Sequence, residues 1–89
     1  MGVEYDAAKD AANQRKHGLP LWLGADVIAN ARESGVVLED TRQAYPERRF
    51  IAYGKAHGRL MVCVFTPRSE NIRVISLRKA NARERAAYG

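Results

Sequence analysis

A chain of 89 residues is long enough for one domain with a thin core, since a domain this small buries only about 60–65% of its unfolded surface. No apolar run approaches the roughly 20 residues of a membrane span, and no charged-then-apolar start resembles a signal peptide. Cys63 is the single cysteine, which excludes a disulfide framework and a thiolate metal cluster. We therefore expect a cytoplasmic protein without membrane association.

The net charge of +5 is unevenly distributed along the chain. Up to Pro46 there are five Lys/Arg against seven Asp/Glu, and from Glu47 onward there are ten against three. Such a basic half is typical of a polyanion binder, and most of its cations are arginines, which suit bidentate contact to phosphate. A solvated face that keeps a small protein soluble has the same composition. The charge distribution thus favours a nucleic-acid-binding protein but does not exclude a basic surface that only keeps the protein soluble.

The first third of the chain predicts two helices. Asp6 is a suitable N-cap for a helix that ends before Gly18, and the alanines of this helix form a narrow stripe suited to packing against a sheet. A second helix is expected to begin near Pro20. Apolar residues recur at helical spacing along one of its faces, which predicts a core position for Trp22; they are Leu21, Trp22, Ala25, Ile28 and Ala29.

After Gly35 the apolar period changes to two, which indicates strands. The expected strands are residues 36–41, 48–55, 60–66 and 71–77, with residues 3–5 as a candidate edge strand and a last helix over residues 81–88. Short turns between the later strands predict an antiparallel meander. The expected fold is one α+β domain over residues 1–89. Its N-terminal helices pack on a curved four-stranded antiparallel sheet, a short C-terminal helix follows, and the helices are expected on one face of the sheet.

Several short segments, spread over nearly the whole chain, together form a pattern typical of one protein family. They are Tyr5-Asp6-Ala7-Ala8-Lys9, Asn13, Lys16-His17-Gly18, the stretch from Glu47 to Gly54, Gly58-Arg59-Leu60, Phe65-Thr66 and the stretch from Ile72 to Ala80. In this order and spacing they resemble the BrnT family of toxins. Residues 19–25 and Pro46 depart from the usual pattern of that family.

The resemblance implies a RelE-like ribonuclease that inhibits translation by cleaving RNA and belongs to a type II toxin–antitoxin system. It also implies a cognate BrnA-like antitoxin encoded beside the toxin. This partner is expected to be a DNA-binding protein with a ribbon-helix-helix fold, and the two chains are expected to form a hetero-oligomer.

The residues themselves offer groups for RNA cleavage, in which the 2′-OH attacks the adjacent phosphorus and no metal or cofactor is required. Such a site needs a base, a cation for the developing charge and an acid. Glu47 and Arg49 are two residues apart on an expected strand, so they share a face and fit a base beside a phosphate clamp. The alternative is a solvated ion pair of little energetic value. With the resemblance, we expect both to be catalytic.

Two further pairs are candidates for the catalytic set. Lys16 and His17 end the first helix, where an imidazole that titrates near neutrality can transfer protons. Their alternative role is to compensate the helix dipole. Arg78 and Lys79 follow the last strand, and we expect them to stabilise charge on the phosphate. The alternative for both, as for Arg59, is that they belong to the general basic surplus of the surface.

Other basic and aromatic residues are expected to contact RNA outside the reaction centre, namely Arg59, Arg73, Arg85 and Tyr88. Tyr88 has the equal alternative of anchoring the last helix to the sheet. No spacing of His, Cys or acidic residues predicts a metal site. We therefore expect a metal-independent endoribonuclease, with a non-catalytic nucleic-acid-binding or regulatory subunit of a DNA-binding complex as the alternative.

Overall fold

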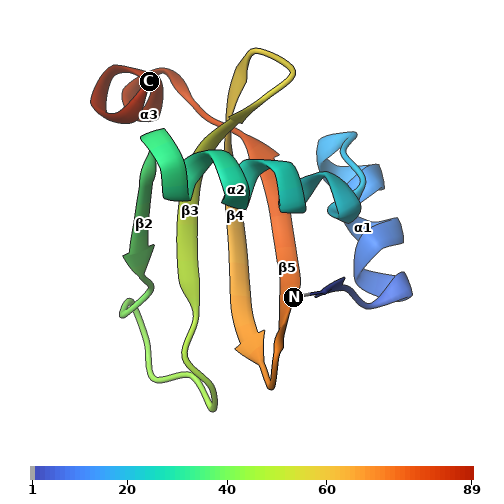
Figure 1. The fold of residues 1–89 in the computed structure, drawn as a ribbon. Coiled ribbons are helices and arrows are strands. Elements are labelled where there is room, and N and C mark those ends of the chain that lie inside the picture. The colour runs from blue at the N-terminus through green and yellow to red at the C-terminus, as the bar shows by residue number, and fades with distance from the viewer. Residues whose placement is uncertain (1) are drawn as a thin grey trace.

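The computed structural model describes residues 2–89. Its elements are in chain order β1 Val3–Glu4, α1 Ala7–His17, the 3-10 helix η1 Leu21–Leu23, α2 Gly24–Ser34, β2 Val36–Glu39, β3 Phe50–Ala56, β4 Arg59–Arg68, β5 Asn71–Lys79 and α3 Ala82–Tyr88. Figure 1 labels all of them except β1 and η1. The expected order of helices and strands is confirmed. Within the described residues, no helix is both long and apolar enough to cross a membrane.

The strands form one mixed sheet in the order β1-β5-β4-β3-β2. The antiparallel meander from β2 to β5 is confirmed. The sheet is not the expected four-stranded antiparallel one, because the candidate edge strand over residues 3–5 forms as β1 and runs parallel to β5, with Val3 beside Ile72. Helices and three strands separate β1 from β5 in the chain, so no hairpin fixes their relative direction.

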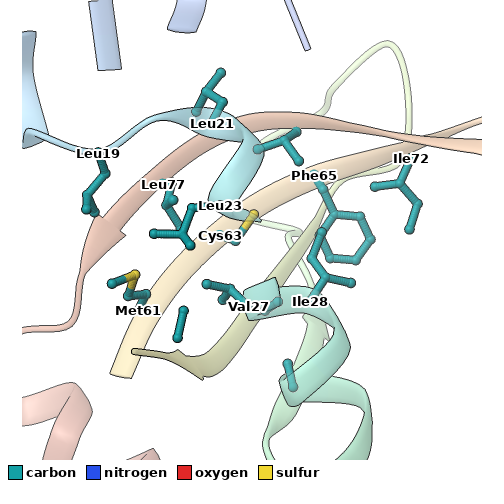
Figure 2. Close-up of a cluster of buried hydrophobic side chains, with 14 residues drawn as sticks. Leu19, Leu21, Leu23, Val27, Ile28, Met61, Cys63, Phe65, Ile72 and Leu77 are labelled. Atoms are coloured by element: carbon teal, nitrogen blue, oxygen red, sulfur yellow. The ribbon is translucent and has the colours of Figure 1, made fainter. Parts of the chain in front are cut away.

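The main core lies between the sheet and the segment formed by η1 and α2 (Figures 1 and 2). Its buried residues are Leu19, Leu21, Leu23, Val27, Ile28, Ala31, Ala52, Ala56, Met61, Cys63, Phe65, Ile72, Val74 and Leu77. A side chain at Gly54 would collide with the backbone of α2 at Val27 and Ala31, so this glycine lets the helix lie close to β3. Burial raises the pKa of the Cys63 thiol to about 12, so the thiol stays uncharged among the apolar side chains of the core.

α1 lies beside β5 at the edge of the sheet (Figure 1) and is attached there by a polar side chain. The expected alanine stripe is exposed, and Asn13 is the buried residue of this helix. The Asn13 side-chain amide donates to the carbonyls of Leu19 and Leu77 at 2.8 and 2.9 Å, and its oxygen accepts from the Leu77 N–H at 3.1 Å. Asn13 thereby satisfies backbone groups on the edge of β5 as a neighbouring strand would.

Two further expectations about the helices are wrong. Trp22 is 55% exposed, because the chain enters α2 through η1 and the apolar positions Leu21 and Leu23 point inward instead. The helices also do not all lie on one face. α3 packs against the opposite face through Tyr88, whose ring stacks on Tyr53 with 4.2 Å between ring centroids. The alternative anchoring role of Tyr88 is therefore realised.

Candidate active site

The sheet face opposite α2, called the open face below, carries most of the candidate residues. A bulge in β5 determines which side chains reach it. Val64 of β4 pairs with Ser76, but the next residue, Phe65, pairs with Val74, so Ile75 is an extra residue in β5. In a regular strand Arg73 and Arg78 would point to opposite faces, and the extra residue places both on the open face.

The first of two hollows associated with this face is called the Glu47 hollow and has a volume of about 250 Å³. It is lined by Lys9, Glu47, Arg49, Thr66, Arg68, Arg73 and Ile75. Among these lining residues one carboxylate faces four cations. Arg73 is also held from outside by Glu4 of β1, with 3.3 Å between Nε and the carboxylate. The hollow therefore combines a proton acceptor with a positive field suited to a phosphate.

Glu47 and Arg49 lie in the loop before β3, which begins at Phe50, and not on the strand as expected. They nevertheless form the expected pair, with 3.3 Å between Arg49 Nε and Glu47 Oε1. The Arg49 guanidinium also lies over the ring of Tyr45, 4.3 Å from its centroid. These two contacts restrict Arg49, and the single long bond to Glu47 leaves that carboxylate accessible to substrate.

The buried Asp40 holds the loop over residues 40–49 in place through its bonds to Arg42 and Tyr45. Its carboxylate is 1% exposed and accepts from Arg42 Nε and Nη2 at 2.8 Å each, and from the Tyr45 hydroxyl at 3.0 Å. These bonds keep the pKa of Asp40 far below its ordinary range. Through Tyr45, Asp40 is a positioning residue for Arg49.

The second hollow, called the His17 hollow below, has a volume of about 410 Å³. It is lined by Lys16, His17, Arg42, Ile51, Tyr53, Val62, Val64, Ser76, Arg78 and Glu84. The structure thus brings together three of the six expected catalytic residues here, whereas Glu47 and Arg49 line the other hollow. A shallow depression lined by Lys9, Ala12, Asn13, Lys16, His17, Ile75 and Ser76 connects the two along α1 and β5.

Arg78 is fixed in the His17 hollow by a bidentate pair with Glu84 of α3, at 2.7 and 2.8 Å. Glu84 also accepts from the backbone N–H of Asn81, whose own side chain caps α3. The Arg78 pair and this backbone bond lower the pKa of Glu84 to about 2, so the carboxylate stays charged over the whole physiological range. The guanidinium is consequently presented in one orientation at the rim of the hollow.

His17 differs electrostatically from an exposed histidine. Partial burial, with the positive charges of Lys16 and Arg78, lowers its pKa from the ordinary 6.5. The imidazole is therefore neutral at pH 7 and able to accept a hydrogen bond or a proton.

The remaining expected residues lie outside both hollows. Lys79 pairs with Met61, a residue of the α2-side core, so it projects from the face opposite to Arg78. Arg59 is exposed in the hairpin between β3 and β4. Arg85 is exposed on α3 and donates to the Ala80 carbonyl at 2.9 Å. Tyr88 contributes indirectly, through its stack on Tyr53.

Sequence reasoning missed several residues of these hollows and their support, among them Lys9, Arg42, Arg68 and Asp40. A signal for Lys9 was present, because Lys9 and Lys16 are seven residues apart and so lie on one side of a helix. Nothing in the local sequence indicates Arg42 or Asp40, whose roles depend on how the loop over residues 40–49 folds back.

The model of the family of BrnT ribonuclease toxins of type II toxin–antitoxin systems matches residues 5–84. This chain belongs to that family. The chain is therefore a ribonuclease toxin, and nothing favours the alternative of a non-catalytic regulatory subunit. No match was found among curated proteins.

The match covers both hollows of this BrnT toxin. Each residue that lines them lies within residues 5–84, whereas Arg85 and Tyr88 lie beyond the matched part. Membership in a type II family also implies an RNA target and an antitoxin partner. The open face, where both hollows lie, is accordingly the part of the fold in which to seek the chemistry.

Proposed function

We propose that the toxin cleaves RNA in the Glu47 hollow by attack of the 2′-OH on the adjacent phosphorus, without a metal ion or cofactor. The observation that carries this proposal is the single accessible carboxylate among four cations. The reaction needs a base for the 2′-OH proton and positive charge around the phosphorus, and this hollow supplies both.

In the proposed step the 2′-oxygen forms a bond to phosphorus while the bond from phosphorus to the 5′-oxygen breaks. Glu47 takes the proton of the 2′-OH, and Arg49 and Arg73 bind the phosphate oxygens as negative charge develops. Arginine does not give up its proton in proteins, so Lys9 is the lining cation able to protonate the leaving 5′-oxygen. The products are a 2′,3′-cyclic phosphate and a 5′-hydroxyl.

Lys16, His17 and Arg78, expected to be catalytic, lie in the neighbouring hollow. We propose that they hold the RNA strand next to the cleaved bond, with Arg78 as a phosphate contact. The connecting depression along α1 gives a strand a path between the two hollows. Lys79, on the other face of the sheet, receives no role in this arrangement.

The proposal predicts that cleavage of a defined single-stranded RNA by the purified protein persists in excess chelator. The cations that stabilise the transition state are side chains, so removing free divalent ions should change the rate by less than about threefold. Cleavage is measured by gel against a metal-dependent nuclease as the control. A rate that collapses in chelator and returns with added divalent ion contradicts the proposal.

We further propose that the toxin acts in the cytoplasm and is neutralised by a BrnA-like, ribbon-helix-helix antitoxin that covers the open face. A basic surface is most simply blocked by an acidic and apolar segment of a partner. The two chains then form a hetero-oligomer in which Arg49 and Arg78 are covered.

This arrangement predicts that the association rate of toxin and antitoxin falls by tenfold or more between low and about 0.5 M salt, since screening weakens steering between opposite charges. Stopped-flow or surface binding kinetics measure the rate. Amide-exchange protection in the complex should include β5 and the loop over residues 40–49. Protection confined to α2, on the other face of the sheet, contradicts direct blocking of the open face by the antitoxin.

A further inference from the structure

The His17 hollow has a feature that phosphate binding does not require, which is an apolar floor. Val62 is buried, and Ile51 and Val64 are half-buried beside it on β3 and β4. These β-branched side chains alternate with the core residues of the same strands, so they form a flat patch on the open face. Only cationic and polar groups at the rim, chiefly Lys16, His17, Arg42 and Arg78, separate this patch from the surroundings.

The wall of the hollow is aromatic on one side. Tyr53 lines it and is stacked on Tyr88, which fixes its ring. Desolvation raises the pKa of Tyr53 above its ordinary value of 10, so the phenol remains neutral. Glu84, the acidic residue among the lining residues, is already bound by Arg78 and by the Asn81 backbone. Arg42 is likewise paired with Asp40, so among the described residues Lys16 is the rim cation without a carboxylate partner, and it makes the rim positive.

We infer that the His17 hollow is a recognition subsite for one nucleotide of single-stranded RNA, with its base on the apolar floor and its phosphate at the cationic rim. This inference rests on the proposed cleavage in the Glu47 hollow, and it assigns to the second hollow the nucleotide beside the cleaved bond. Single-stranded RNA is recognised through unstacked bases laid on apolar and aromatic side chains, with cations on the backbone.

The size of the hollow and its composition select this ligand class. About 410 Å³ is within the range of small-molecule pockets and is far more than a phosphate needs. An inorganic anion leaves the floor uncovered, and an apolar segment leaves Lys16 without an anionic partner and the remaining donors of Arg42 and Arg78 unused. A nucleotide covers both parts. The Ser76 hydroxyl lies among the lining residues and offers a donor or acceptor to the edge of the base.

The test is a titration of isotope-labelled protein with the four nucleoside 5′-monophosphates, ribose 5-phosphate and inorganic phosphate, followed by amide chemical shifts. We expect at least one nucleotide to shift the amides of Val62, Val64 and Ser76 and to bind at least tenfold more tightly than ribose 5-phosphate. Equal shifts and affinities for phosphate alone would show an anion site only and overturn the inference. So would shifts confined to the Glu47 hollow.

A variant pair sharpens the test. Ser76→Phe fills the hollow and should reduce nucleotide affinity at least tenfold and raise KM for RNA more than it lowers kcat. Ala29→Phe, on the exposed face of α2 and away from the residues that line the His17 hollow, is the control and should change neither. If Ser76→Phe does not fold, the titration of the unmodified protein still decides. Unchanged nucleotide binding in folded Ser76→Phe overturns the inference.

Glu47→Gln separates this inference from the proposed function. Loss of RNA cleavage with unchanged nucleotide binding at Val62 and Val64 supports both. Absence of nucleotide binding, together with cleavage that still depends on Glu47, removes the subsite and leaves the proposed function standing. Nucleotide binding in the hollow, together with full cleavage by Glu47→Gln, removes the proposed function and leaves the subsite.

Discussion

Glu47→Gln is expected to abolish RNA cleavage, with a loss of about 10²–10⁴-fold for removal of a general base. Arg49→Ala should lose about 10²–10³-fold, as when one group that stabilises transition-state charge is removed. Both side chains are at the surface of a loop, Glu47 being 40% exposed, so the stability of the fold should change by no more than about 1 kcal/mol. Single-turnover cleavage of a defined RNA and thermal unfolding measure the two effects.

Arg85→Ala is the matched control for these variants. Arg85 is an exposed cation of α3 outside both hollows, so its loss should weaken RNA binding modestly and reduce the salt slope of binding by about 1. Its turnover rate at saturating RNA should remain unchanged. Full activity of folded Glu47→Gln and Arg49→Ala would remove both residues from the site.

The second large effect is expected on stability. Asn13→Ala removes three hydrogen bonds at once and leaves backbone groups of Leu19 and Leu77 without partners in a buried place. An unsatisfied buried group costs about 1–3 kcal/mol, so we expect a loss of roughly 2–4 kcal/mol in the free energy of unfolding. Chemical denaturation measures this loss. In a domain of this size it corresponds to a fall in Tm of more than about 10 °C.

Gln14→Ala provides the comparison on the same helix. Gln14 is exposed and its side chain bonds only to Asp10, so its loss should stay within about 0.5 kcal/mol. A loss for Asn13→Ala no larger than that for Gln14→Ala would show that α1 is held to β5 by other contacts.

The element order could be predicted because the apolar period changes from that of helices to that of strands at Gly35. The position of α1 could not be predicted, because an alanine stripe is compatible with burial or with exposure. In the structure the hydrogen bonds of Asn13 to Leu19 and Leu77 orient the helix and leave the alanines exposed. Trp22 was misplaced for a related reason. Its spacing from Ala25 and Ala29 fits one face of a single helix, whereas the chain passes through η1 first, and this changes the face on which the tryptophan lies.

The candidate site was predictable as a set of residue types and less so as an arrangement. Glu47 and Arg49 form a pair as expected, although the strand begins after them. Arg73 and Arg78 share a face only because of the bulge at Ile75. The alternation of apolar and polar residues in the sequence does not predict this bulge. Both hollows take lining residues from the loop over residues 40–49, which is held by the buried Asp40.

The measurement that tests the central claim most directly uses an RNA in which one 2′-OH, at a mapped cleavage position, is replaced by hydrogen. If the 2′-oxygen is the nucleophile, the modified RNA remains uncut at that position. The unmodified RNA then yields a 2′,3′-cyclic phosphate, or its hydrolysis product, and a 5′-hydroxyl, as identified by mass. Cleavage at the modified position, or a 3′-hydroxyl end on the upstream product, would contradict cleavage by 2′-OH attack in the Glu47 hollow.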